Sequence, residues 1–470
     1  MKLLYVTSEA APFAASGGLG DVMGALPPEM KRANPADDVR VILPYYKKKI
    51  SEKYASALKK VSEFEFSYGW RRAYAAVYAL DFESVTYYFV DNEQYFDRPN
   101  LYGQFDDGER FAYFSLAVLE FLIRSDYTPD VLHANDWQTA LTVVYLKTKF
   151  SGVPKLSGIR SVFTIHNIEY QGKYDLSILG DIFALDYSYT GIVEYDGCIN
   201  LMKGAIVCAD RVTTVSPNYA NEIRQSFFAY GLQHIINLYG YKLSGIINGI
   251  DTTYFSPSLG GEIPFAYSAD NVAEGKKQNR AALMQELGLD NDPSAPLIVM
   301  ITRLTHGKGV DLLLHVFEEM MAENVRFVLL GTGDAEYEKV FSDLCSRYPG
   351  KAKAEIRFDR ALSKRMYAAA DIFLMPSKSE PCGLAQMIAC SYGTLPIVRA
   401  VGGLYDTIKA GVNGFLFKNF NAHELLYRIK DAVSLFHSTE EWNALRAGAM
   451  ASDFTWSSSA IRYSELYRQL

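Results

Sequence analysis

Basic side chains follow one of the apolar segments of the chain, in a position suited to binding a phosphate-bearing ligand. Arg303 and Lys308 come directly after the apolar run 297–301, ahead of a helical pattern over residues 310–319. An arginine, a lysine and the N–H groups at a helix start each favour an anion, and arginine can donate two hydrogen bonds to one phosphate. This arrangement suits a diphosphate whose charge grows as it leaves. An exposed pair of surface cations is the alternative interpretation.

An acidic residue, Glu380, follows the apolar run 372–375. A carboxylate in such a loop can accept hydrogen bonds from two neighbouring hydroxyls of a sugar, and the amides after it can donate to phosphate or hydroxyl oxygens. A glutamate that caps the next helix beside a proline turn is the alternative. Cys382, in the same loop, has no activating base nearby in the sequence and is expected to be a packed residue rather than a nucleophile.

In the first half of the chain, Asp136 follows the run 131–133 and His166 follows the run 161–165. Both lie where a parallel sheet presents its ligand-facing loops, so both are candidates to contact a sugar. Hydrogen bonding to buried loop backbone is the alternative for each. The seven histidines include no HxH or HExxH spacing, so we expect no metal site.

A short glycine motif, GGLxD, occurs twice, as GGLGD at residues 17–21 and as GGLYD at residues 402–406. Each copy follows an apolar run and precedes a helical stretch. Paired glycines at such a turn let the backbone approach a ligand closely, and a helix start offers unpaired N–H groups. Two copies, one in each half, indicate two α/β domains that face one phosphate-bearing ligand. Ordinary tight turns are the alternative.

The glycines of a third turn, Gly331 and Gly333, follow the run 326–330. The turn resembles a truncated dinucleotide-binding motif without its third glycine, so we interpret it as a packing feature.

Composition excludes several classes of protein. The chain has 470 residues, 49% of them apolar and 21% charged, which is typical of a folded protein with two or three domains. Its net charge of −7 includes no basic stripe, which argues against nucleic acid and anionic membranes as partners. The pattern at the N-terminus predicts a first strand, and no apolar run reaches transmembrane length. The five cysteines are scattered along the chain. We therefore expect a reduced, cytoplasmic protein.

Continuous apolar, β-branched runs alternate with helical patterns along the whole chain. Strands of this kind, separated by helices, are typical of parallel sheets covered on both faces, whose ligands bind beyond the carboxyl ends of the strands. We predict a boundary between two domains within residues 244–251. The predicted strands are residues 3–6, 39–44, 86–90, 131–133, 161–165 and 212–215 in the first domain, and 297–301, 326–330, 372–375 and 395–398 in the second.

The last segment, residues 454–470, reads as a loop and an amphipathic helix. Ile461, Tyr463, Leu466 and Tyr467 fall on the apolar side of this helix. We expect the helix to return to the first domain, and capping of the second domain is the alternative. The predicted domains are residues 1–244, joined by a helix within 453–470, and residues 245–452.

Taken together, these segments resemble the bacterial glycogen synthases and plant starch synthases, which are retaining glycosyltransferases of the GT-B fold. The resemblance covers essentially the whole chain, with many motifs in one order. They are SEAAPFAASGGLGDVMGALP (8–27), HANDWQTAL (133–141), FTIHNIEYQGKY (163–174), TTVSPNYANEI (213–223), SGIINGID (244–251), ITRLTHGKGVDLL (301–313) and SEPCGLAQMIACSYGTLPIVRAVGGLYDT (379–407). The implied fold is α/β, with two Rossmann-like domains of doubly wound parallel sheets that face each other across a deep cleft.

The resemblance implies transfer of glucose from ADP-glucose to the 4-hydroxyl at the non-reducing end of an α-1,4-glucan such as glycogen, with retention of configuration. No cofactor and no metal are expected. By resemblance, Arg303 and Lys308 hold the diphosphate, Glu380 binds hydroxyls of the donor sugar, and Asp136 and His166 contact that sugar from the first domain.

Further contacts follow from the resemblance alone. Phe358 stands where the family usually has a tyrosine stacked on adenine, and Tyr95 and Phe96 fall at an aromatic acceptor position. The other implied donor-binding residues are Gly17, Gly18, Asn248, Cys382, Gly383, Leu384, Gly402, Gly403 and Leu404.

Two positions depart from the pattern of related enzymes. Ala15 stands where the family has a lysine that reaches the donor phosphates, and Ile388 stands where some related transferases have a ribose-binding carboxylate. The first departure bears on donor affinity and on the choice between ADP- and UDP-linked glucose. One alternative is therefore a retaining transferase for UDP-glucose or another donor, and another is a catalytically weak homologue that only binds α-glucan. The sequence does not give the oligomeric state.

Overall fold

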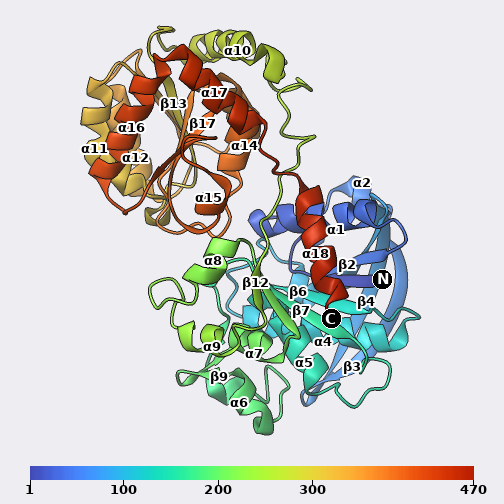
Figure 1. Ribbon diagram of the computed structural model, residues 1–470. Helices are drawn as coiled ribbons and strands as arrows, with labels where there is room; N and C mark the ends of the chain where they lie inside the picture. Colours follow the sequence, from blue (N-terminus) through green and yellow to red (C-terminus); the bar gives the residue numbers. More distant parts are fainter. The chain divides into compact units, whose positions relative to one another are not determined.

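The computed structural model describes residues 1–470 and divides into two compact units (Figure 1). The first unit contains Met1–Ile246 and Trp456–Leu470, and the second contains Ile247–Thr455. Both units are built around sheets that are mainly parallel, with helices between the strands, which confirms the predicted α/β class. The change of unit at Ile246 lies within the predicted boundary segment.

The first unit holds a nine-stranded sheet in the order β12-β11-β7-β6-β1-β2-β5-β4-β3. Every strand predicted in this half is present, because strands that are buried on both faces must be apolar at successive positions. The strands are β1 (Lys2–Val6), β2 (Asp38–Pro44), β3 (Lys59–Tyr68), β4 (Arg71–Phe82), β5 (Val85–Asp91), β6 (Val131–Asn135), β7 (Arg160–Ile165), β11 (Arg211–Thr214) and β12 (Leu243–Gly245).

The short edge strand β12 and the β3–β4 hairpin are the parts of this sheet that the pattern of apolar runs did not predict. β4 is antiparallel to both β3 and β5. Near the end of β3, Phe64, Phe66 and Tyr68 are buried and the residues between them are exposed. One face of such a strand lies in water, so its sequence alternates and contains no continuous apolar run.

The helices of the first unit include four long ones between its strands and one at the end of the chain. The long helices are α1 (Gly18–Ala33), α4 (Asp107–Arg124), α5 (Trp137–Lys147), α7 (Leu201–Cys208) and α18 (Trp456–Arg468). The shorter ones are α2 (Glu52–Ala55), α3 (Glu93–Phe96), α6 (Thr190–Val193), α8 (Pro217–Glu222) and α9 (Gln233–Leu238). A small antiparallel sheet in the order β8-β10-β9 contains β8 (Lys173–Tyr174), β9 (Glu194–Tyr195) and β10 (Cys198–Asn200).

The C-terminal helix α18 belongs to the first unit, where it packs against α1 (Figure 1). The Tyr467 hydroxyl bonds to His133 Nδ1 at 2.6 Å and to the Tyr5 hydroxyl at 3.0 Å. Burial lowers the pKa of His133 to about 3, so this imidazole is neutral. Tyr463 and Leu466 are also buried, whereas Ile461 is 57% exposed. The prediction for Ile461 was therefore wrong, because α1 covers a narrower stripe of the helix than the apolar pattern indicated.

The second unit holds a six-stranded parallel sheet in the order β15-β14-β13-β16-β17-β18. Its strands are β13 (Leu297–Ile301), β14 (Arg326–Leu330), β15 (Ala352–Glu355), β16 (Ile372–Met375), β17 (Leu395–Arg399) and β18 (Phe415–Phe417). Its helices are α10 (Val272–Leu287), α11 (Val310–Ala322), α12 (Ala335–Ser346), α13 (Arg360–Ala369), α14 (Ala385–Ser391), α15 (Gly402–Thr407), α16 (Ala422–Phe436) and α17 (Thr439–Met450). None of the helices in the chain has both the length and the apolar composition required to cross a membrane.

Candidate active site

In the second unit, the loops that follow β13 and β16 meet at Gly309. This residue has φ +71° and lies between the short 3-10 helix η4 (His306–Lys308) and α11. A Cβ at Gly309 would lie 2.1 Å from the carbonyl oxygen of Pro376, so the close approach requires glycine. The Lys378 N–H also donates to the Gly307 carbonyl at 3.0 Å, which joins the two loops a second time.

Two of the predicted catalytic side chains meet at this junction. The Lys308 ammonium donates to Oε2 of Glu380 at 2.7 Å, and the Ser377 hydroxyl donates to the same oxygen at 3.0 Å. Glu380 is buried, with 7% of the residue exposed. Its hydrogen bonds all go to Oε2, which leaves Oε1 available to a ligand hydroxyl. Ser377 was not predicted, because a lone serine in a loop carries no signal in the sequence.

The predicted partner of Lys308, Arg303, lies in the same loop but does not join this ion pair. Its guanidinium is exposed and makes no hydrogen bond or ion pair within the chain. The loop is held by two glycines after β14. A Cβ at Gly331 would lie 1.9 Å from the Thr302 carbonyl oxygen, and one at Gly333 would lie 2.2 Å from that of Leu304. The glycine turn is thus a packing feature, as interpreted from the sequence, and it positions a free arginine at the end of β13.

The start of α14 offers unpaired backbone amides close to Glu380. No protein group accepts a hydrogen bond from the N–H groups of Gly383 and Leu384. Cys382, just before them, is buried, and burial raises the pKa of its thiol to about 12, against the effect of a hydrogen bond from the Asn248 backbone. Cys382 is therefore a neutral packed thiol. The Asn248 side chain is also buried, and its Oδ1 has no hydrogen-bond partner.

The second glycine pair has a different role from the one predicted for it. The Gly403 N–H donates to the carbonyls of Glu380 and Pro381 at 3.1 Å each, and the Leu404 N–H donates to a carbonyl in its own turn. A Cβ at Gly402 would lie 1.9 Å from the Glu380 carbonyl oxygen. These glycines let the turn before α15 pack against the Glu380 loop, so the Gly403 and Leu404 amides are occupied within the protein.

Phe358, between β15 and α13, is 81% exposed. A phenylalanine taken by itself is most simply expected in a core, and here the structure places the ring in solvent. Its face is available for stacking with a planar ligand group.

In the first unit, Asp136 and His166 lie together at the carboxyl ends of β6 and β7. Oδ1 of Asp136 accepts the His166 backbone N–H at 2.7 Å, and His166 Nε2 lies 2.9 Å from Oδ1 of Asn135. The Asn135 amide nitrogen donates to two carbonyls, so its oxygen must face the histidine. His166 therefore donates through Nε2, and Nδ1 is left as an acceptor for a ligand hydroxyl.

The backbone and the charge of Asp136 are both perturbed. Its φ of 57° and ψ of 176° fall in a region that only glycine occupies freely, which costs about 1–3 kcal/mol for another residue. Desolvation raises the pKa of Asp136 to about 7, against two backbone hydrogen bonds that lower it. Desolvation also lowers the pKa of His166 to about 3. Strain and perturbed pKa values of this kind are typical of functional sites, and residue type alone indicated neither of them.

The glycine loop before α1 is held by a glutamate that the sequence analysis missed. Oε2 of Glu9 accepts the Ser16 hydroxyl at 2.8 Å and also accepts the Ser16 N–H, and burial raises the pKa of this carboxyl. A Cβ at Gly17 or Gly18 would meet nothing within 4 Å, so the protein itself leaves this space open. Glu9 follows β1 as Asp136 follows β6, so the strand-end rule could have identified it.

The predicted acceptor platform is not exposed. Phe96 is fully buried and Tyr95 is 5% exposed. The Tyr95 hydroxyl donates to Glu109 at 2.8 Å, and its ring centroid lies 4.7 Å from that of Tyr113. Both side chains therefore belong to the core beneath the β3–β4 hairpin, which corrects the expectation from the resemblance. Residue type did not show this, because the aromatic partners come from distant segments.

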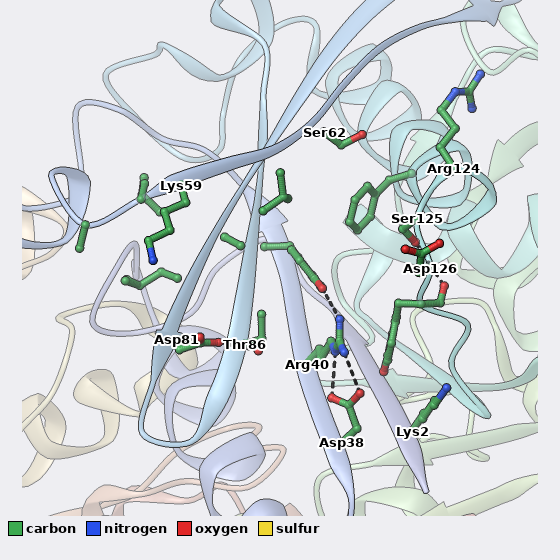
Figure 2. A pocket seen from close by; sticks show the side chains of 18 of the residues that line it. Lys2, Asp38, Arg40, Lys59, Ser62, Asp81, Thr86, Arg124, Ser125 and Asp126 are labelled. Atoms are coloured by element: carbon green, nitrogen blue, oxygen red, sulfur yellow. Dashed lines mark hydrogen bonds and ion pairs between the residues drawn. The ribbon is translucent and has the colours of Figure 1, made fainter.

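A cavity of about 1020 Å³ in the first unit lies away from these residues (Figure 2). It is lined by Lys2, Asp38 and Thr86, at the amino ends of β1, β2 and β5, on the opposite edge from Asp136. Arg40 within it donates to both carboxylate oxygens of Asp38 at 2.8 Å. Because ligands of parallel sheets bind at the carboxyl ends, this cavity is not the candidate site. No group of three or more His, Cys, Asp or Glu side chains is arranged to hold a metal ion.

Comparisons with known proteins give matches along the whole chain, all of them to glycosyltransferases. Residues 2–238 match the family model of the starch synthase catalytic domain, and residues 281–444 match that of glycosyl transferases group 1. A glycogen synthase of Streptococcus agalactiae is 43% identical over the full length of both chains. One of Geobacillus stearothermophilus is 45% identical, over 100% of this chain and 98% of the relative.

A solved structure supports the same assignment. The catalytic domain of starch synthase IV from Arabidopsis thaliana, bound to ADP and acarbose, matches with a TM-score of 0.89 and 33% identity, over 99% of this chain and 98% of that one. Sucrose-phosphate synthase from Thermosynechococcus elongatus, at 17% identity and a TM-score of 0.64, shares the fold. The chain therefore belongs to the glycogen and starch synthase family, glucosyltransferases of the GT-B fold.

Proposed function

We propose that this glycogen synthase homologue transfers glucose from ADP-glucose to the non-reducing 4-hydroxyl of an α-1,4-glucan, with retention of configuration. The observation that carries the proposal is the Lys308–Glu380 pair at the carboxyl ends of β13 and β16, with the free guanidinium of Arg303 in the same loop as Lys308. The ADP in the related starch synthase IV structure supports a nucleoside diphosphate as the leaving group.

In this proposal, Arg303 and Lys308 stabilise the departing diphosphate. Negative charge grows on the phosphate oxygen as its bond to the glucosyl carbon breaks, and a cation held in place beforehand stabilises that charge without reorganising. The unpaired amides of Gly383 and Leu384 add two donors for phosphate or hydroxyl oxygens. Oε1 of Glu380 accepts hydrogen bonds from hydroxyls of the donor sugar, while Lys308 and Ser377 hold Oε2.

The glucosyl carbon is attacked on the face that the diphosphate leaves, which retains the configuration. The acceptor O4 forms the new bond, the departing phosphate oxygen takes the proton of the 4-hydroxyl, and the carbon has oxocarbenium character between these events. No side chain needs to act as a nucleophile, and the mechanism needs no metal. His166 Nδ1 and the Asp136 loop contact the sugar, and the open space at Gly17 and Gly18 admits the ligand.

The proposal also names the two substrates of the enzyme and the cellular compartment in which it works. The donor is a nucleotide sugar and the acceptor is glycogen. The five cysteines are all free, which supports a reduced cytoplasmic environment.

The test measures incorporation of radiolabelled glucose into glycogen from ADP-glucose and from UDP-glucose. Lys308→Ala and Glu380→Ala are each expected to lower kcat by about 10²–10³-fold, because each removes a group that acts on the reacting sugar or its leaving group. The matched control is Lys378→Ala, since this lysine lies in the same loop but its ammonium contacts His306 rather than Glu380. Near-normal rates in both site variants would refute the assigned roles.

The donor comparison separates the alternatives. Preference for UDP-glucose would show that the loss of the family lysine at Ala15 has changed the donor. Glycogen binding without chain extension from either donor would show a binding homologue.

A further inference from the structure

An exposed tryptophan, Trp70, has no part in the proposed chemistry. It stands at the turn between β3 and β4, and the residue is 79% exposed. A large aromatic side chain in water forgoes the free energy of burial, and its face stays available for stacking with a ligand.

The Trp70 ring is held in one orientation by its neighbours. Its indole N–H donates to the Asp181 carboxylate. The Arg71 guanidinium lies 5.4 Å from the Trp70 ring centroid and 4.7 Å from that of Tyr68, and it donates to the Asp181 carbonyl at 3.0 Å. The turn itself touches this segment, because a Cβ at Gly69 would lie 3.3 Å from the Asp181 carbonyl oxygen. The ring is therefore a preorganised platform.

A second exposed ring, Tyr187, belongs to the same surface. The residue is 62% exposed. A Cβ at Gly180 would lie 3.3 Å from a Tyr187 ring carbon, so this ring packs against the residue that precedes Asp181. We call the surface formed by Trp70, Arg71, Asp181 and Tyr187 the Trp70 patch.

The charges of the Trp70 patch favour a neutral ligand with hydroxyl groups. Arg71 is paired with Glu109 at 2.6 Å and lies 3.9 Å from Asp181, so the patch offers no free cation for phosphate. The C–H face of a pyranose ring is weakly positive and stacks on the negative face of an aromatic ring. The Asp181 carboxylate, 56% exposed as a side chain, can accept hydrogen bonds from sugar hydroxyls beside the ring.

The Trp70 patch lies at the edge of the sheet that carries the site residues of the first unit. β4 is antiparallel to β5, and Ala76 of β4 pairs with Asp91 at the carboxyl end of β5. Arg71 is five residues earlier in β4, so the hairpin turn extends about 17 Å beyond that edge. Asp136 and His166 follow the carboxyl ends of β6 and β7 at the same edge.

We propose that the Trp70 patch binds a chain of the α-1,4-glucan, as a second contact for the polymer besides the residues that handle the donor. This inference rests on the proposed function, since the polymer is the acceptor of that reaction. A particle with many chain ends can occupy both places at once, and two linked contacts hold the enzyme on it more tightly than either alone.

The experiment uses the full chain and two readouts. The first is migration in native gels that contain glycogen, and the second is initial rate with glycogen and with maltotriose as acceptors. Trp70→Ala is expected to weaken glycogen binding and raise the KM for glycogen by about tenfold, with kcat and the KM for maltotriose unchanged. Asp181→Ala keeps the Trp70 ring but removes the carboxylate that accepts its indole N–H. This variant is expected to have a smaller effect in the same direction.

The matched control is Tyr241→Ala. Tyr241 is 77% exposed but precedes β12, and therefore lies at the amino ends of the parallel strands. Its variant should behave as the parent in both readouts.

Three results would overturn the inference. They are unchanged glycogen migration for Trp70→Ala, an equal rise of KM for maltotriose, or a change only in self-association by size exclusion, which would make the patch a protein contact. Failure of the proposed function is separate: the parent enzyme would then transfer no glucose from either donor, even if Trp70-dependent binding to glycogen persists.

Discussion

Replacing Gly309 by alanine perturbs the junction on which the proposed diphosphate site depends. At φ +71° an L-residue costs about 1–2 kcal/mol. The new Cβ would also lie 2.1 Å from the Pro376 carbonyl oxygen, where ordinary contact begins at 3.4 Å. A backbone oxygen cannot rotate away, so the two loops must separate by more than 1 Å. The 2.7 Å contact between Lys308 and Glu380 spans these loops and is expected to break.

A displacement of about 1 Å at a catalytic group lowers rates by roughly 10²-fold, so Gly309→Ala is expected to lose about that factor in kcat. The control is Gly307→Ala, two residues away in the same loop, where a Cβ meets nothing within 4 Å. Initial rates with saturating donor and the midpoint of urea unfolding are measured for both variants. Equal rates and equal midpoints for the two would refute the argument that Gly309 sets the distance between the loops.

Three further predictions concern single positions. Ala15→Lys restores the cation of the family motif and is expected to lower the KM for the nucleotide sugar at least tenfold. The reason is that a hydrogen bond to a charged group contributes about 1.5–3 kcal/mol. An unchanged KM would contradict a phosphate contact at this position. Tyr467→Phe leaves a buried nitrogen of His133 unpaired and is expected to reduce the free energy of unfolding by about 1–3 kcal/mol, whereas Ile461→Ala on the same helix changes it by less than about 0.5. Asp136→Asn mimics the protonated acid. Because the pKa of Asp136 is raised from 3.8 to about 7, the parent loses stability as the pH rises through this window and the variant does not. The stability of the variant relative to the parent should thus grow by up to about 1.4 kcal/mol per pH unit between these values, and a constant difference would contradict the raised pKa.

Much of the candidate site follows from one rule applied to the sequence. Asp136, His166, Arg303 and Glu380 were predicted because each follows a continuous apolar run, and each lies after the carboxyl end of a parallel strand in the structure. The same rule would have found Glu9, which follows β1. It could not find the β3–β4 hairpin, whose alternating strand lacks such a run.

Pairing between distant residues was not predictable in the same way. Lys308 and Glu380 are 72 positions apart, and nothing in the local sequence shows that Lys308 forms an ion pair while Arg303 stays free. The exposure of aromatic rings could not be predicted from the sequence either. Phe358 is 81% exposed and Phe96 is fully buried, although both stand among polar residues in the sequence.

The sequence by itself determined the parallel α/β architecture, the place of the candidate site residues after the carboxyl ends of the strands, and the family. It did so because a strand buried on both faces must be apolar at successive residues, and because the motifs occur in one order. Only the tertiary structure decided which charges are paired, which glycines serve packing, and which aromatic rings face solvent. Those properties depend on neighbours that folding brings together from far along the chain, and residue type alone does not record them.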